Sequence, residues 1–330
     1  MQAVILAAGR GTRLLPITQM RTKAMLPVLG KPMIARIITA LAFCGVREFI
    51  LVTSPTDQEM STYFLSSPIP GVEIQFVEQF EPRGMAHALI CAEPWINGDF
   101  ILSACDSLLS LEDYALLISA WNCEPKLAAL LALLPINPEK ASQTGIVQIE
   151  NGLITRIIEK PAPDQVFSNI ASLPIYLFEQ RIFSHLSRLK PSKRGELELQ
   201  DAIQMLIDSY GRVRGELVSS RMNLTSAQDL LEINLYFLQK EAPQKIQDPV
   251  QIGRNVTLIP PYFLGANTII GDQCVIGPQV YVESNAHIGQ GCSISNTILL
   301  QGSRLDLPQV IKNTIIFPEQ STHQNQGSTQ

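Results

Sequence analysis

Over the first 240 residues the apolar positions switch repeatedly between two periodicities, which predicts strands alternating with helices. Continuous apolar runs at residues 3–8, 48–54, 99–105 and 127–134 are typical of buried strands, and residues 73–79 alternate as a strand does. Helical spacing covers residues 33–45, 57–65, 84–93 and 111–123. Strands separated by helices imply right-handed crossovers. We therefore predict an α/β fold with a doubly wound, mainly parallel, Rossmann-like sheet covered on both faces.

The pattern changes near residue 143, where shorter apolar runs follow one another without helices between them. Strands are expected at residues 145–149, 154–159 and 173–178, and the dipeptide Asn151-Gly152 between the first two is a strong hairpin signal. In the parallel part of the sheet, ligands belong at the carboxyl ends of the strands. Gly9, Gln79 and Asp106 each follow such a strand.

The C-terminal region repeats an aliphatic residue every six positions. The nine residues are Ile252, Leu258, Leu264, Ile270, Ile276, Val282, Ile288, Ile294 and Leu300. This strict period predicts a hexapeptide solenoid, a short parallel β-helix in which residues eighteen apart stack. Cys274 and Cys292 should then share one ladder, and Asn313-Thr314 repeats Asn296-Thr297 in one further coil. We expect domains at residues 1–240 and 241–320, followed by a polar, disordered tail at 321–330.

Two roles are open for this solenoid. Acetyl transfer is known for hexapeptide coils, but His287 is the sole histidine of the repeats, and a lone histidine on a solenoid turn is more often a surface residue. Packing against the first domain or oligomerisation is favoured, because the end coils of a short solenoid need covering.

Composition narrows the classes of partner. The chain has 330 residues, of which 46% are hydrophobic and 17% charged, with a net charge of −5, so no basic patch is expected and nucleic acid is an unfavoured partner. There is no apolar span of 18 residues, and the N-terminus leads directly into a strand, so we expect a cytoplasmic protein with no membrane association. The six cysteines form no C-x-x-C pair and are expected to be buried thiols.

The turn after the first strand has the chemistry of a phosphate-binding loop. Gly9 and Gly11 allow backbone N–H groups to approach an anion, while Arg13 and Lys23 supply positive charge. The dinucleotide fingerprint needs a third glycine where Leu14 stands, and the Walker sequence is absent. Glycines that serve turn geometry alone are the rival interpretation for these two positions.

The longer sequence around this loop resembles the opening signature of the sugar-1-phosphate nucleotidylyltransferases. The resemblance rests on Gly9-x-Gly11-Thr12-Arg13-Leu14-x-Pro16, then on residues 23–28 (KAMLPV) and 31–34 (KPMI). Thr22 and Met85 are similar to the Ser and Leu of the thymidylyltransferase branch, and the solenoid resembles the left-handed β-helices attached to many members.

The resemblance implies a site residue by residue. It assigns catalysis to Arg13, Lys23, Asp106 and Lys160. It assigns nucleotide binding to Leu6, Ala8, Gly9, Gly11, Thr12, Arg13, Lys23, Gln79 and Gly84, with Gln79 on the nucleobase. It assigns sugar-phosphate binding to Gly145, Glu159 and Lys160, and metal binding to Asp106 and Asn223. The rival interpretations are a solvated pair for Glu159 and Lys160, and a helix-capping role for Asp106.

The implied reaction joins dTTP or UTP to an aldose 1-phosphate with Mg²⁺ as cofactor, giving a nucleotide sugar and pyrophosphate. Residues 221–230 correspond to a family segment with a second metal carboxylate and a glycine, where this chain has Asn223 and Thr225, and Cys105 replaces a common glycine. These departures support an alternative hypothesis, a silent homologue that binds nucleotide and regulates a partner subunit. A homo-oligomer is expected in either case.

Overall fold

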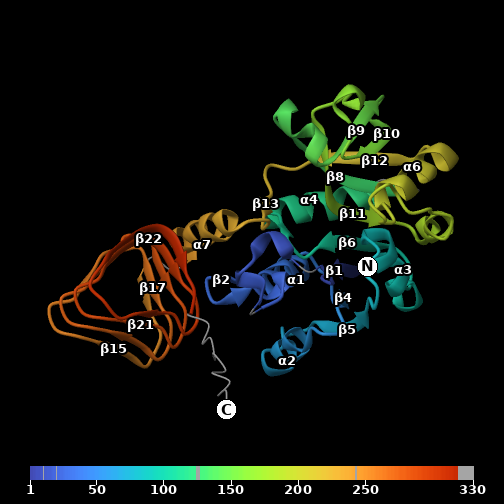
Figure 1. Ribbon diagram of the computed structural model, residues 1–330. Coiled ribbons are helices and arrows are strands. Elements are labelled where there is room, and N and C mark those ends of the chain that lie inside the picture. The colour runs from blue at the N-terminus through green and yellow to red at the C-terminus, as the bar shows by residue number, and fades with distance from the viewer. Residues whose placement is uncertain (10, 20, 124–126, 242–243, 319–330) are drawn as a thin grey trace, which may run out of the picture. The chain divides into compact units, whose positions relative to one another are not determined.

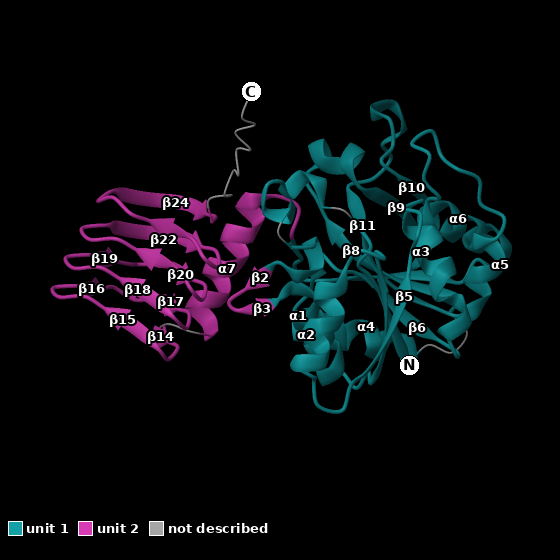
Figure 2. Cartoon of the chain, turned by 60° about the horizontal axis from the view of Figure 1, so that its bottom comes forward, with its two compact units in different colours: residues 1–26, 32–223 teal, residues 27–31, 224–330 magenta. Residues whose placement is uncertain are grey.

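The computed structural model describes residues 1–9, 11–19, 21–123, 127–241 and 244–318, and the chain forms two compact units (Figure 2). Unit 1 contains residues 1–26 and 32–223, and unit 2 contains residues 27–31 and the chain from 224 onward. Unit 2 thus includes a helix that lies before the domain boundary expected at 240–241, and that division into domains remains a prediction. The tail expected to be disordered, residues 321–330, lies outside the described residues.

Unit 1 is built on a nine-stranded sheet with the order β5-β4-β1-β6-β11-β8-β12-β10-β9 (Figure 1). The strands are β1 Gln2–Leu6, β4 Glu48–Thr53, β5 Glu73–Glu78, β6 Phe100–Ala104, β8 Ala129–Pro135, β9 Gly145–Glu150, β10 Leu153–Glu159, β11 Ile170–Phe178 and β12 Val213–Leu217. β5, β4, β1 and β6 pair in parallel, as the alternation of strands and helices predicts. β11 then pairs antiparallel to both β6 and β8, so the second half of the sheet is mixed.

Helices connect the parallel strands. The α-helices of unit 1 are α1 Met33–Phe43, α2 Gln58–Ser66, α3 Met85–Ala92, α4 Leu111–Cys123, α5 Phe183–Leu186 and α6 Leu199–Tyr210. The 3₁₀ helices are η1 Thr12–Leu14, η2 Ile17–Gln19, η3 Lys23–Met25, η4 Glu93–Trp95, η5 Pro138–Gln143, η6 Pro163–Gln165 and η7 Gln180–Ile182. All five residues of β1 are buried, and alternate ones, Val4 and Leu6, share a core cluster with Leu89 of α3 and Leu206 of α6. Burial on both faces explains why these strands are apolar throughout.

Two short pairings complete unit 1. The hairpin of β9 and β10 turns at Asn151-Gly152, where both residues have positive φ, as its sequence predicts. β7 (Ser107–Leu108) pairs antiparallel with β13 (Met222–Asn223), which brings two segments distant in sequence side by side.

Unit 2 combines the helix α7 (Ala227–Glu241) with stacked strands. These are β14 Gln244–Ile246, β15 Val250–Ile252, β16 Thr257–Leu258, β17 Tyr262–Leu264, β18 Thr268–Ile270, β19 Val275–Ile276, β20 Val280–Val282, β21 His287–Ile288, β22 Ser293–Leu299, β23 Arg304–Leu305 and β24 Val310–Ile316. The strands pair in parallel, at a spacing of eighteen residues in pairs such as β16 with β19 and β19 with β22, and of seventeen in later pairs such as β21 with β23, so the predicted parallel β-helix is confirmed. The repeat of residues 296–299 by 313–316 is also confirmed, because β22 pairs with β24 in that register.

The sixfold period forms the solenoid core. Leu264, Ile270, Ile276, Val282, Ile288 and Ile294 are all buried there, whereas Ile252 in an end coil is 43% exposed. Cys274 and Cys292 are buried in the same core, and each directly precedes one of two strands in register. All six cysteines are free thiols, but the expectation of burial holds only for Cys105, Cys274 and Cys292, because Cys44 and Cys91 are half-buried and Cys123 is exposed. Within the described residues, no helix is both long enough and apolar enough to cross a membrane.

Candidate active site

The loop after β1 brings glycine and lysine together. Gly11 has a φ of 62°, and a Cβ built on it would lie 3.0 Å from both Lys23 Cβ and Thr18 Cγ2. Thr18 Oγ1 also donates to the Gly11 carbonyl at 2.9 Å. Only glycine combines this backbone conformation with so close an approach. Thr12 and Arg13 follow in η1 with exposed side chains, while Leu6 and Ala8 before the loop are buried.

Lys23 forms an ion pair with Asp106, which follows β6, the strand beside β1. The lysine side chain is 11% exposed and the carboxylate 20%. The backbone N–H of Cys105 donates to the Leu6 carbonyl at 3.2 Å, which ties the end of β6 to the end of β1. Burial, followed by the charge of Asp106, raises the pKa of the Cys105 thiol to about 12, so this residue is neutral beside the pair.

The rival capping role for Asp106 does not hold, because Ser110 caps the next helix. Ser110 Oγ accepts from the Asp113 N–H at the start of α4, at 3.1 Å. Asp106 instead accepts from Ser107 Oγ at 3.2 Å. Its carboxylate therefore remains turned toward Lys23 and is not committed to a helix end.

Asn223 lies beside this ion pair. In the ladder between β13 and β7, Asn223 is the partner of Ser107, the residue after Asp106. Two residues farther on, Thr225 begins the capping of α7: its N–H and hydroxyl donate to Asp229 at 2.7 and 2.6 Å. Burial opposes ionisation of Asp229, but these hydrogen bonds prevail and its pKa is lowered.

Gln79 is buried at the end of β5 and uses one amide nitrogen twice. Its Nε2 donates to the Gly84 carbonyl at 3.2 Å and lies 3.0 Å from His87 Nδ1. The segment around Gly84 is in turn fixed by Leu197, whose backbone N–H donates to the Arg83 carbonyl at 2.8 Å. His87 gave no signal in the sequence, because its eight-residue separation from Gln79 fits no single element.

Gly145 and Glu159 are partners in the ladder of β9 and β10. A Cβ on Gly145 would lie 3.0 Å from Glu159 Oε2, and the carboxylate also lies 3.7 Å from Lys160 Nζ. Burial raises the pKa of Glu159 despite the nearby charges of Lys160 and Arg194. Lys160 is 47% exposed and has a φ of 45°, a conformation that non-glycine residues seldom adopt. The solvated-pair interpretation thus fits Lys160 better than Glu159, which is only 15% exposed.

These groups meet at one edge of the sheet. Gly9, Gln79 and Asp106 follow the parallel strands β1, β5 and β6, whose carboxyl ends share that edge. β11 runs in the opposite direction, with Ile175 opposite Ser103, so its earlier residues lie toward Asp106. Ser172 of β11 pairs with Gly145, which brings the predicted sugar side to the same edge. Three sets of residues are in direct contact within themselves: Gly11, Lys23 and Asp106; Gln79, Gly84 and His87; and Gly145, Glu159 and Lys160.

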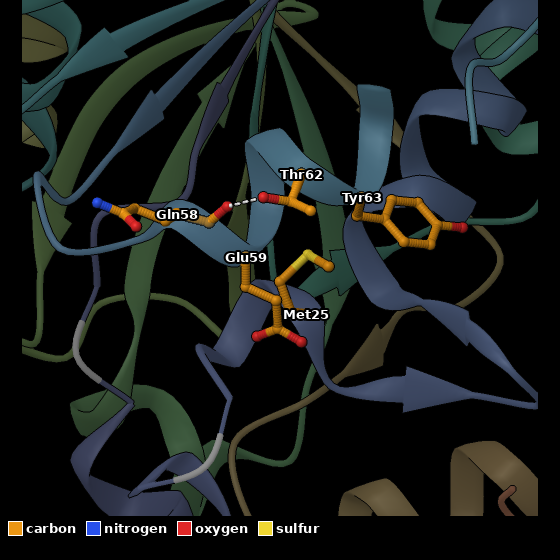
Figure 3. A pocket seen from close by; sticks show the side chains of 5 residues that line it. All are labelled: Met25, Gln58, Glu59, Thr62 and Tyr63. Atoms are coloured by element: carbon orange, nitrogen blue, oxygen red, sulfur yellow. Dashed lines mark hydrogen bonds between the residues drawn. The ribbon is translucent and has the colours of Figure 1, made fainter. Parts of the chain in front are cut away.

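A separate cavity of about 320 Å³ lies along the first turns of α2 (Figure 3). It is lined by Met25, Gln58, Glu59, Thr62 and Tyr63. Only Glu59 carries a charge among them, and Arg21 approaches that carboxylate at 3.8 Å. A cavity with an acidic lining disfavours a triphosphate, and it contains none of the residues predicted for the site.

Comparison with known proteins identifies the class. Residues 2–257 match the nucleotidyl transferase family and residues 258–325 match the GMPPB C-terminal domain. The chain belongs to the nucleotidyl transferase family and is a sugar-1-phosphate nucleotidylyltransferase in type. Such enzymes act on a nucleoside triphosphate and a sugar 1-phosphate, generally use a divalent metal, and are often oligomeric.

Three similar proteins illustrate the relationship. The bifunctional protein GlmU of Methanococcus maripaludis is 30% identical over 96% of this chain and 77% of its own length. The UTP–glucose-1-phosphate uridylyltransferase AglF of Haloferax volcanii is 34% identical over 63% of this chain and 84% of its own. A crystal structure of a putative glucose-1-phosphate thymidylyltransferase from Bacillus anthracis, in complex with a sucrose, is 28% identical. It covers 72% of this chain and 94% of its own, with a TM-score of 0.64.

Proposed function

We propose that this protein transfers a nucleotidyl group from dTTP or UTP to an aldose 1-phosphate and releases pyrophosphate. The observation that carries the proposal is the ion pair of the buried Lys23 with the half-buried Asp106, next to Gly11 of the glycine loop. A lysine ammonium is a point charge suited to a polyphosphate, and Lys23 opens η3 within the stretch that follows β1. The names of the uridylyltransferase and thymidylyltransferase relatives support the choice of nucleotides.

The reaction needs placement and charge neutralisation more than proton transfer. A phosphate monoester has a second pKa of about 6, so a sugar 1-phosphate is mostly dianionic at neutral pH and is already a nucleophile. One of its oxygens forms a bond to the α-phosphorus, and the bond from that phosphorus to the bridging oxygen breaks, so pyrophosphate leaves with the electron pair. Arg13 and Lys23 would hold the triphosphate, and Lys160 would hold the sugar phosphate.

We propose Mg²⁺ as the metal, held by the carboxylate of Asp106 and the amide oxygen of Asn223. The donor set fits, because Mg²⁺ is usually bound by one or two carboxylates together with substrate phosphates. Among the described residues no group of three His, Cys, Asp or Glu side chains could hold a metal without such help. When bound, the ion would neutralise charge on the phosphates. Lys23 shares the same carboxylate, so the lysine and the metal would divide the charge of Asp106.

The nucleobase would be read by Gln79. Both of its hydrogen bonds use Nε2, so Oε1 is the atom that would accept the N3–H shared by thymine and uracil. Glu159 would accept sugar hydroxyls beside Gly145, its partner in the ladder of β9 and β10. These roles agree with the positions of the residues at one edge of the sheet.

A second candidate is a silent homologue that binds nucleotide and regulates a partner subunit. The position of Asn223 beside Asp106 favours it, since an amide in place of a carboxylate removes one full charge from a hard-cation site. The test is a panel of nucleoside triphosphates and sugar 1-phosphates in which pyrophosphate release and thermal stabilisation are measured together. Release supports the transferase. Thermal stabilisation without pyrophosphate release at any divalent metal supports the regulator. If the protein shows neither stabilisation nor release, both hypotheses are contradicted.

A further inference from the structure

The stretch that leads to Asn223 joins two ladders of unit 1. Val218, the residue after β12, is buried, and its backbone N–H donates to the carbonyl of Leu133 in β8 at 2.9 Å. The next ladder begins with β13, which contains Asn223. Ser219 and Ser220 lie between these points and are exposed, so apolar packing does not fix them. Polar contacts are therefore needed to hold this stretch in place.

Asp113 in the first turn of α4 holds the stretch with both of its carboxylate oxygens. Its Oδ1 accepts from the Ser219 N–H at 2.9 Å, and its Oδ2 accepts from the Ser219 hydroxyl at 2.7 Å. Oδ2 also accepts from Ser110 Oγ at 3.1 Å. Asp113 is only 5% exposed, so these bonds to a charged acceptor are protected from water. One side chain of α4 thus fixes Ser219 at two points.

The same turn of α4 also contacts the chain beside Asp106 (Figure 1). Tyr114, the residue after Asp113, is fully buried, and its hydroxyl donates to the Ser107 carbonyl in a long hydrogen bond of 3.4 Å. Ser107 follows Asp106 and is the ladder partner of Asn223. Neighbouring residues of one helical turn therefore contact β7 on one side and the chain that enters β13 on the other. A packed helix of this kind keeps the two contacts at a fixed separation.

We propose that Asp113 is a positioning residue for the metal, and that it acts through Ser219 on the place of Asn223 beside Asp106. This inference rests on the proposed function, because it takes Asp106 and Asn223 as ligands of Mg²⁺. Mg²⁺ requires near-octahedral coordination with metal–oxygen distances of about 2.0–2.1 Å, whereas Ca²⁺ accepts longer distances and flexible geometry. A looser stretch should therefore weaken the binding of Mg²⁺ more than that of Ca²⁺. A general loss of stability would not distinguish the two ions.

The test compares nucleotide affinity in the two metals. Calorimetry with UTP or dTTP, first in Mg²⁺ and then in Ca²⁺ and without sugar phosphate, gives two dissociation constants, and their ratio is the readout. Asp113→Ala should shift this ratio against Mg²⁺ by about tenfold. Asp113→Asn should leave it near the wild-type value, because an amide still accepts from the Ser219 N–H and can bond to the hydroxyl through Nδ2. In an Asn223→Ala background, Asp113→Ala should have no further effect.

Two more variants keep the test sharp. Ser219→Ala replaces Asp113→Ala if that protein does not fold, because it removes only the hydroxyl bond, and it should shift the ratio in the same direction by about threefold. Trp121→Phe is the matched control in the last turn of α4, where Trp121 Nε1 donates to Asp99 Oδ2 at 3.1 Å. It should lower the melting temperature and leave the ratio unchanged.

The inference is overturned if Asp113→Ala, or Ser219→Ala in its place, leaves the ratio unchanged. It is also overturned if Asp113→Asn or Trp121→Phe shifts the ratio as far as Asp113→Ala does, or if Asp113→Ala has its full effect without Asn223. A shift in Asn223→Ala without one in Asp113→Ala would overturn this inference alone. An Asn223→Ala protein with the wild-type ratio would contradict the proposed metal site itself.

Discussion

The two glycines of the loop after β1 should differ in how much stability the same added methyl group costs. Gly11 has a left-handed backbone, and its added Cβ would lie 3.0 Å from Lys23 Cβ and Thr18 Cγ2. Left-handed backbone costs a non-glycine residue about 1–2 kcal/mol, and overpacking costs about 1–3 kcal/mol. Gly11→Ala should therefore lower the free energy of unfolding by about 2–5 kcal/mol. It should also displace Lys23 and reduce turnover.

Gly9→Ala is the matched control, because a Cβ there meets nothing within 4 Å. Its free energy of unfolding should stay within about 0.5 kcal/mol of the wild type. If backbone N–H groups at Gly9 approach phosphate, the methyl group should nevertheless weaken triphosphate binding. Urea unfolding gives the stabilities, and calorimetry with the nucleotide gives the affinities. Equal stability losses in the two variants would refute the assignment of strain to Gly11, and unchanged affinity in Gly9→Ala would refute the approach of phosphate to Gly9.

Three further predictions concern titration and metal binding. Burial raises the pKa of Glu159, so Glu159→Gln should raise the free energy of unfolding near pH 7, and unfolding curves against pH should show this difference vanish below about pH 4. The same substitution should weaken sugar-phosphate binding. Burial, then Arg188, lowers the pKa of His185, so stability should fall as the pH drops below about 6.5, where the unfolded chain gains a proton; His185→Phe should remove that slope. Asn223→Asp should tighten Mg²⁺ binding in a titration of nucleotide affinity, and an unchanged metal dependence would show that residue 223 is no ligand.

Much of the fold follows from periodicity. The strict six-residue repeat predicts a β-helix, and the structure has one. A continuous apolar run such as that of β1 predicts a strand buried on both faces, as is found. The short pairing of β7 with β13 could not be predicted, because two residues per strand carry no period. That pairing nevertheless places Asn223 beside Asp106. The hydrogen bond from the Leu29 N–H to Asn234 Oδ1 could not be predicted either, since it joins residues 205 positions apart.

The site was predictable where residue types and spacing restrict the chemistry, and less so where contacts decide it. The glycines and the lysine of the loop lie within one stretch of sequence, residues 9–23, and carry complementary phosphate-binding chemistry, so their meeting could be expected. The ion pair of Lys23 with Asp106 depends on the adjacency of β1 and β6, which no local pattern reveals. His87 was missed for the same reason, because only the fold brings its ring to Gln79.

The most direct test of the central claim is pyrophosphate release by the wild type and by Lys23→Gln under the same conditions. With UTP or dTTP, glucose 1-phosphate and Mg²⁺, the wild type should release one pyrophosphate for each nucleotide sugar formed. Loss of the lysine should slow release by about 10²-fold or more, since a charge aimed at the transferring phosphates is removed. Equal rates in the two proteins would contradict the role given to the ion pair of Lys23 and Asp106, and no release by the wild type with any pair of substrates would contradict the transferase itself.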